Sequence, residues 1–114
     1  MTIAPIFPMN LNELAALPER QTPLLLQHAF HVEVHFEIVV PEALRPPTTL
    51  TPTEVRDGER AVVVRDAVHG RVLVLDRVVD IPAGRVLPGP EYARFLRYIH
   101  DGDNLVQRQL LLGK

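Results

Sequence analysis

The chain has 114 residues, a formal net charge of −2 and no cysteine. This length suits one domain over residues 1–114 and is too short for two ordinary ones. The lack of cysteine excludes disulfides, thiolate metal ligands and a cysteine nucleophile, and the scattered basic residues argue against nucleic-acid binding. No apolar run approaches the roughly 18–20 residues that a membrane helix needs, so we expect no membrane insertion.

We expect residues 1–22 to form a loosely ordered N-terminal segment. Pro5 and Pro8 oppose a regular start. Asn10 can cap a short helix, which Pro18 would end. The segment lacks a basic stretch followed by an unbroken apolar run, so it does not look like a secretory signal.

Strict alternation makes residues 30–40 the clearest strand of the chain. Its two faces are an apolar set and a polar set: Phe30, Val32, Val34, Phe36, Ile38 and Val40 against His31, Glu33, His35 and Glu37. A period of two predicts a half-buried antiparallel strand. Pro41 ends the strand because proline has no N–H to donate.

Residues 42–58 are rich in proline and predict a loop, with a short extended segment near residues 50–55. Residues 60–68 and 71–81 then predict a hairpin that turns at His69 and Gly70. In the second strand of this hairpin, Arg77 interrupts an otherwise apolar face.

A helix is predicted over about residues 90–101, with Pro90 at its first position and Tyr92, Phe95 and Ile99 at helical spacing. Gly102 is expected to weaken or end this helix. Residues 107–112 favour a closing strand, and the alternative is that the helix continues past Gly102.

The polar face of the first long strand carries a candidate metal site. His31, Glu33 and His35 stand at alternate positions, so their Cα atoms are about 6.5–7 Å apart along one face. Two imidazoles and a carboxylate in this arrangement can share a zinc ion. The alternative is a solvated strand face whose polar residues pair with the neighbouring strand.

Other acidic groups favour structural roles over catalysis. Asp76 and Asp80 flank Arg77, which predicts a structural ion pair ahead of an acid–base pair. Asp101 and Asp103 surround Gly102, but the spacing of a calcium loop is absent, so we interpret them as a helix stop. The chain has no glycine-rich phosphate loop, no GxSxG and no HExxH motif. We therefore predict no enzymatic activity, no catalytic residues and no cofactor.

From Glu19 to Leu112, the order of the predicted strands, turns and helix resembles that of a known family. This family is the small C-terminal β-rich domain of unknown function found in bacterial multidomain proteins that carry a transglutaminase-like domain upstream. The matching residues are Arg20, Pro23, Pro41, Arg77, Gly84, Pro88 and Tyr92. The resemblance implies a mainly β fold, an immunoglobulin-like antiparallel β-sandwich with one C-terminal helix over about residues 90–101.

The same resemblance implies a non-catalytic accessory or interaction module. The Cys-His-Asp machinery of such parents belongs to the transglutaminase-like domain, and none of it carries over to a chain without cysteine. Its partner would be a protein, namely the adjacent catalytic domain. Such parents are usually exported, which would place this domain in the periplasm or at the cell surface; the localisation is otherwise open.

Two other functions compete with this interpretation. One is a stand-alone structural domain that associates with itself through an exposed strand edge. The other is a metal-binding protein that uses His31, Glu33 and His35.

Overall fold

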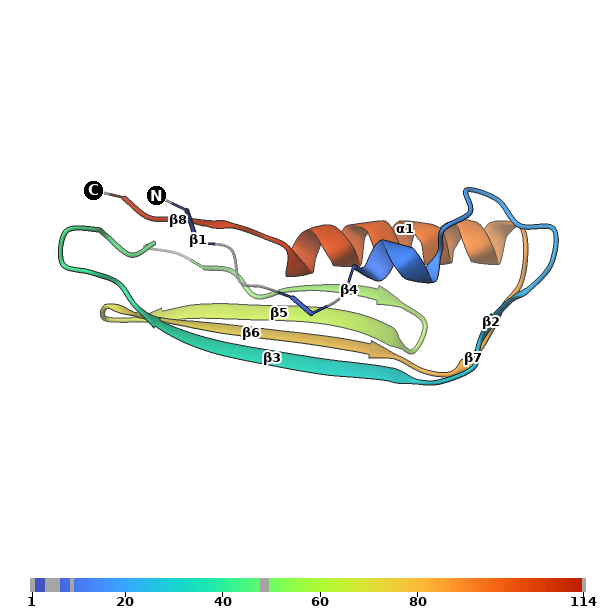
Figure 1. Ribbon diagram of the computed structural model, residues 1–114, viewed down its shortest axis with the longest axis horizontal. Helices are drawn as coiled ribbons and strands as arrows, with labels where there is room; N and C mark the ends of the chain where they lie inside the picture. Colours follow the sequence, from blue (N-terminus) through green and yellow to red (C-terminus); the bar gives the residue numbers. More distant parts are fainter. Residues whose placement is uncertain (1, 4–6, 9, 48–49, 114) are drawn as a thin grey trace.

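A computed structural model describes residues 2–3, 7–8, 10–47 and 50–113 of the chain. Its centre is an antiparallel sheet of four strands in the order β3–β6–β5–β4 (Figure 1). These strands are β3 (Phe30–Val39), β4 (Thr53–Asp57), β5 (Arg60–His69) and β6 (Val72–Ile81). The prediction of a mainly β chain with one C-terminal helix is confirmed.

Shorter elements surround this sheet. β1 (Thr2–Ile3) pairs with β8 (Leu110–Leu111), and β2 (Leu24–Leu26) pairs with β7 (Gly84–Val86). A 3₁₀ helix, η1 (Leu11–Leu14), precedes the sheet, and a helix, α1 (Pro90–Val106), follows it. Among the described residues, the layer that packs on the four-stranded sheet is therefore α1 with η1, and the two other sheets are ladders of two or three residues per strand.

The hairpins of the sheet form where the sequence predicts them. β5 and β6 turn at Gly70, whose φ of +61° is a conformation that glycine adopts without strain. Gly58, with φ of +60°, makes the equivalent turn between β4 and β5. β4 is the extended segment that the sequence suggested within the proline-rich stretch, and its pairing with β5 places it at one edge of the sheet.

The helix covers one half of the sheet. α1 contacts β4 and β5, and its buried Phe95 and Ile99 join Val62, Val64 and Val79 in the main hydrophobic core. Figure 1 shows α1 above β4 and β5, whereas β3 forms the lower boundary of the molecule. Because the helix lies over the β4 side, the side chains of β3 receive less cover than those of β5.

The predicted end of the helix near residue 101 is wrong, because α1 continues to Val106. Gly102 lies inside the helix, where it faces the sheet. A Cβ atom at this position would lie 2.8 Å from Cγ2 of Val62 and 3.6 Å from Cδ1 of Leu11. The glycine therefore serves close packing of helix on sheet, and the predicted closing strand follows it as the short β8.

A second core fills the other half of the same sheet face. The C-terminal residues Leu110 and Leu112 pack with Val40, Leu73 and Leu75. The guanidinium of Arg71 fixes the loop that follows β3 by donating to the carbonyls of Val40, Pro41 and Leu44. This arrangement closes the end of the sheet that α1 does not reach.

The N-terminal segment, which the sequence suggested would be loosely ordered, contributes to the main core where the structure describes it. Phe7, Leu11 and Ala15 are buried, and Leu11 is fully inaccessible. Residues 1, 4–6 and 9 of this segment lie outside the described residues.

Candidate functional site

The polar residues of β3 form a row on the face of the sheet opposite α1. We call His31, Glu33, His35 and Glu37 the polar row. All four are exposed, and their partners across the ladder are Asp80 for His31 and Asp76 for His35. The structure thus brings the three predicted metal-site residues onto one strand face, as the alternation required.

The side chains of the polar row form two separate clusters. Nε2 of His31 lies 2.8 Å from Oε1 of Glu33, and its Nδ1 lies 3.7 Å from Oδ1 of Asp80. His35 contacts Asp76 through Nδ1, and its Nε2 lies 3.4 Å from Oε1 of Glu37. Among the described residues, no group of three or more His, Cys, Asp or Glu side chains has the arrangement of a metal site. The metal-binding hypothesis for His31, Glu33 and His35 stays a prediction.

These contacts favour the protonated form of both histidines. The hydrogen bond to Glu33 raises the pKa of His31, and the charges of Glu33 and Asp80 act in the same direction. For His35 the hydrogen bond to Asp76 is the largest cause that raises the pKa, followed by the hydrogen bond to Glu37. The polar row is therefore a chain of histidine–carboxylate pairs in contact with solvent.

The ion pair predicted within β6 is not formed by Asp76, Arg77 and Asp80 with one another. Asp76 and Asp80 lie on the outer face with the histidines, whereas Arg77 points into the core and is 1% exposed. Its Nη2 lies 3.2 Å from Oδ2 of Asp66, a buried carboxylate of β5 that the sequence analysis did not single out. Successive residues of a strand point to opposite faces, which is why Arg77 cannot reach its neighbours in the sequence.

Arg77 and Asp66 belong to a buried cluster that holds the end of α1. Arg108 also donates to Oδ2 of Asp66, at 2.8 Å. Arg77 donates to the carbonyl of Val106, the last helical residue, and to that of Arg108 at 3.3 Å. Burial lowers the pKa of Arg77, and Asp66 opposes this effect. The guanidinium satisfies carbonyls that the helix end leaves without partners, so the cluster has a structural role.

Asp103, the residue considered for a calcium loop, joins α1 to η1. Its Oδ1 accepts the N–H of Leu11 at 2.9 Å, and its Oδ2 lies 3.3 Å from the side-chain amide nitrogen of Asn12. Asn10 caps η1, as predicted, by accepting the N–H of Asn12. Asp103 is thus a cap for a distant segment, which is a structural role.

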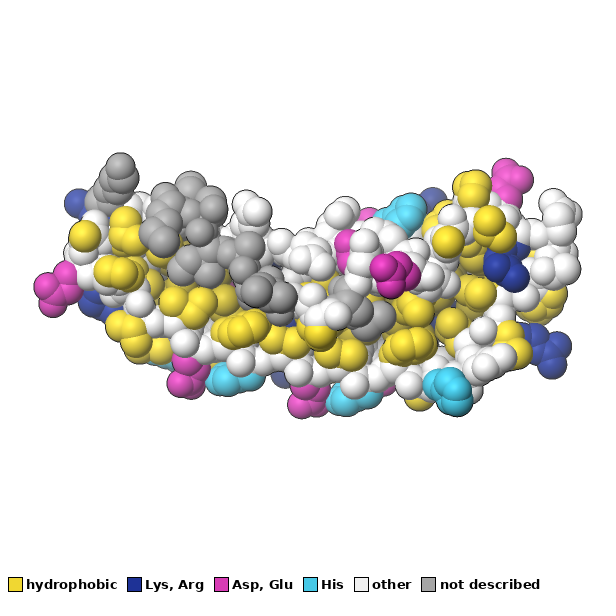
Figure 2. All heavy atoms as spheres, viewed as in Figure 1, with side chains coloured by type: hydrophobic (Ala, Val, Ile, Leu, Met, Phe, Trp, Pro, Cys, Tyr) yellow, Lys and Arg dark blue, Asp and Glu magenta, His cyan; other side chains and the backbone are white. Residues whose placement is uncertain are grey.

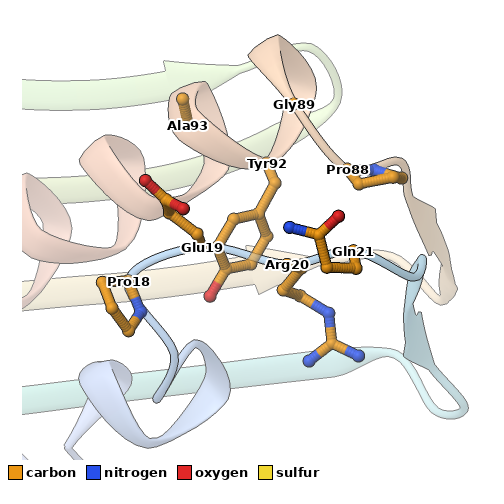
Figure 3. Close-up of a pocket in the computed structure, with 8 residues that line it drawn as sticks. All are labelled: Pro18, Glu19, Arg20, Gln21, Pro88, Gly89, Tyr92 and Ala93. Carbon is orange, nitrogen blue, oxygen red and sulfur yellow. The ribbon is translucent and has the colours of Figure 1, made fainter.

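A hollow of about 560 Å³ lies where α1 begins, beside residues 18–21 (Figure 3). Its polar side chains hold the surrounding loop. The hydroxyl of Tyr92 donates to the carbonyl of Leu17, and Arg20 donates to the carbonyls of Thr22 and Pro23. Arg20 and Tyr92 therefore support this loop. Both are residues on which the family resemblance depends.

The open edge of the sheet, by which we mean the outward side of β3, has no partner strand among the described residues. β3 pairs only with β6, and in the part of the chain that the structure describes no backbone hydrogen bond reaches its other side. The strand is ten residues long and contains neither proline nor lysine, two residues that commonly protect an edge. The other edge strand, β4, has five residues, follows Pro52 and contacts α1.

Half-buried apolar side chains lie along this edge on the inner face. We call Phe30, Val32, Val34, Phe36 and Ile38 the apolar stripe; each packs on a core but stays partly accessible. Figure 2 shows a band of hydrophobic side chains above a row of histidine and acidic side chains along the lower boundary, where β3 lies. An edge strand with one apolar and one charged face offers both main-chain and side-chain contacts to a partner strand.

Comparisons with known protein families, with curated proteins and with solved structures found no match for this chain. In the described part of the chain, no helix is both long enough and apolar enough to cross a membrane.

Proposed function

We propose that this chain is a non-catalytic interaction module that binds a protein partner by adding a strand at the open edge. In this mode the main-chain hydrogen bonds supply affinity, and alternate side chains of the added strand supply specificity. The observation that carries the proposal is the unpaired ten-residue β3, whose apolar stripe is only half-buried.

The backbone of β3 is available for such pairing. The N–H of Val40 donates to the carbonyl of Arg71 at 2.7 Å, and hydrogen-bonded pairs alternate along an antiparallel ladder without a bulge. Even-numbered residues of β3 therefore bond to β6, and odd-numbered residues direct their N–H and C=O groups outward. The same odd-numbered residues carry the polar row, so an added strand would contact both the backbone and the charged side chains.

A more specific proposal is that the chain is the accessory domain of a transglutaminase-like protein, with the immunoglobulin-like sandwich of that class. The resemblance in Arg20, Pro23, Pro41, Arg77 and Tyr92 supports it. A neighbouring coding sequence for a Cys-His-Asp catalytic domain would add support, and that domain would then be the first partner to test.

A displayed library of random peptides tests the proposed function directly. The protein is immobilised sparsely, so that its copies do not meet, and selected peptides are sequenced. We expect peptides in which apolar and charged residues alternate. Their binding should be lost in Val34→Lys, which puts an ammonium group into the apolar stripe, and in Glu33→Pro, which removes an outward N–H but no bond to β6.

The matched control is Thr53→Lys on β4, the other edge strand, which should bind the selected peptides like the unaltered chain. Thermal melting confirms that each variant is folded, and Glu33→Pro keeps the test valid where Val34→Lys does not fold. Peptides that bind equally to all four proteins, or a selection that yields no alternating peptides, would overturn the proposal.

A further inference from the structure

We infer that the open edge pairs with the open edge of a second copy of this chain, antiparallel, with Val34 on the two-fold axis. This inference rests on the proposed function and names its partner. The evidence is that the order of side chains along β3 is complementary to the same order in a second copy whose β3 runs in the opposite direction.

Charge order favours this register. With Val34 opposite Val34 of the second copy, His31 lies opposite Glu37 and Glu33 lies opposite His35. Each histidine of one polar row thus meets a glutamate of the other, and opposite charges in direct cross-strand pairs stabilise a sheet. Both histidines already lie between carboxylates, Glu33 and Asp80 for His31 and Glu37 and Asp76 for His35, so added carboxylates meet imidazoles that favour the charged form.

The registers centred one residue to either side lack this complementarity. A centre at Glu33 places His31 opposite His35 and Glu33 opposite itself, and a centre at His35 places Glu33 opposite Glu37. Like charges directly opposite one another destabilise a pair of strands. If the two-fold axis passed between two residues of β3, the charged face of one copy would lie beside the apolar face of the other.

The apolar stripe matches in the same register. Phe30 lies opposite Ile38, Val32 opposite Phe36, and Val34 opposite itself, so partly accessible apolar side chains cover one another along the whole contact. The outward-directed backbone groups of residues 31, 33, 35 and 37 would form about eight hydrogen bonds across the axis. The product is one continuous sheet through both copies, with both helices on the same face.

A single cysteine tests the register, because the chain has none of its own. In Val34→Cys the two thiols meet across the axis at a spacing that a disulfide accepts. In the control Val32→Cys, the two thiols lie four residues apart along the strands, about 13 Å. Under mild oxidation at a concentration where the chain associates, Val34→Cys should form a disulfide-linked dimer at least about tenfold faster than Val32→Cys.

A charge exchange tests the same pairing without a covalent bond. His31→Glu with His35→Glu gives one acidic row, and Glu33→Lys with Glu37→Lys gives one basic row. Sedimentation should find each double variant monomeric, because each row repels its own copy. An equimolar mixture of the two should form a heterodimer, since the carboxylates introduced at positions 31 and 35 then lie opposite the ammonium groups introduced at positions 37 and 33.

The outcomes separate this inference from the proposed function. A chain that selects alternating peptides but stays monomeric into the millimolar range keeps the proposed function and overturns the second copy as partner. Equal cross-linking of Val34→Cys and Val32→Cys, or a mixture of the charge variants that stays monomeric, overturns the register. Dimers that form at an unchanged level in Val34→Lys would overturn this inference alone, because the contact between copies would then not be the open edge, and the peptide selection would still decide the proposed function.

Discussion

Each face of the four-stranded sheet carries a cluster of charged side chains, and the two clusters differ in their access to solvent. On the inner face, the side chains of Asp66 and Arg77 are 0% and 1% exposed, and they hold the end of α1. On the outer face, the side chains of His31 and His35 are each 56% exposed and contact neighbouring carboxylates. A charge on this sheet is therefore structural where it is buried and available for a partner where it is not.

The largest expected effect comes from removing the carboxylate that the buried cluster shares. Asp66→Ala leaves Arg77 buried without its counter-charge and beside Arg108, so we expect the free energy of unfolding to fall by about 3–5 kcal/mol. Urea denaturation followed by circular dichroism measures it. The matched control is Asp76→Ala on the outer face, whose effect should be several-fold smaller; equal effects would remove the distinction between the two faces.

A smaller effect is expected at the contact that presses α1 onto the inner face. Gly102→Ala puts a methyl group 2.8 Å from Cγ2 of Val62, so one of the two elements must shift. Overpacking should cost about 1–3 kcal/mol, against the roughly 1 kcal/mol that alanine gains over glycine within a helix, so we expect a net loss of up to about 2 kcal/mol.

Val62→Ala provides the space that the added methyl group needs. In a double-mutant cycle, Gly102→Ala should therefore cost less in the Val62→Ala background than in the unaltered chain. A Gly102→Ala variant that is more stable than the unaltered chain would show that helix propensity, and not the close approach, decides the role of this residue.

The smallest effect should be the dependence of stability on pH from the polar row. The pKa values of His31 and His35 are raised, so the folded chain binds protons more tightly than the unfolded chain, whose histidines titrate near 6.5. This contribution is complete below the unfolded pKa and is lost as the pH rises through the folded pKa values. The melting temperature of the unaltered chain should exceed that of His31→Gln with His35→Gln by more at about pH 5.5 than at about pH 8.5. A difference that does not vary with pH would contradict this assignment.

Local patterns predicted the strands well, because their causes lie within a few residues. Alternation and Pro41 located β3 to within one residue of its observed end, and Gly70 located the turn between β5 and β6. The helix end was missed because Gly102 is explained by Val62 and Leu11, which lie on other elements. A glycine that permits close packing and a glycine that ends a helix look the same in one sequence.

The two charged clusters were predictable to different degrees. The polar row follows directly from the alternation of β3. For the buried cluster, the available signal was a charge on the apolar positions of each strand, Asp66 among valines and Arg77 among leucines and valines. The third member, Arg108, gives no such signal, since it lies beyond the helix. The sequence also does not predict that β3 is an edge strand, because the order of strands in the sheet depends on which strands pair after the hairpins form.

The bond between the N–H of Leu11 and Asp103 spans 92 positions of the chain, and this separation affects how the protein can fold during synthesis. The ribosome completes all four strands of the central sheet before it makes α1. Until residue 106 has emerged, the sheet face that will carry the main core has no helix to cover it, and the N–H of Leu11 lacks the carboxylate of Asp103. A nascent chain of this kind exposes valine-rich strands for the seconds that the last residues require, and it depends during that interval on not meeting another such chain.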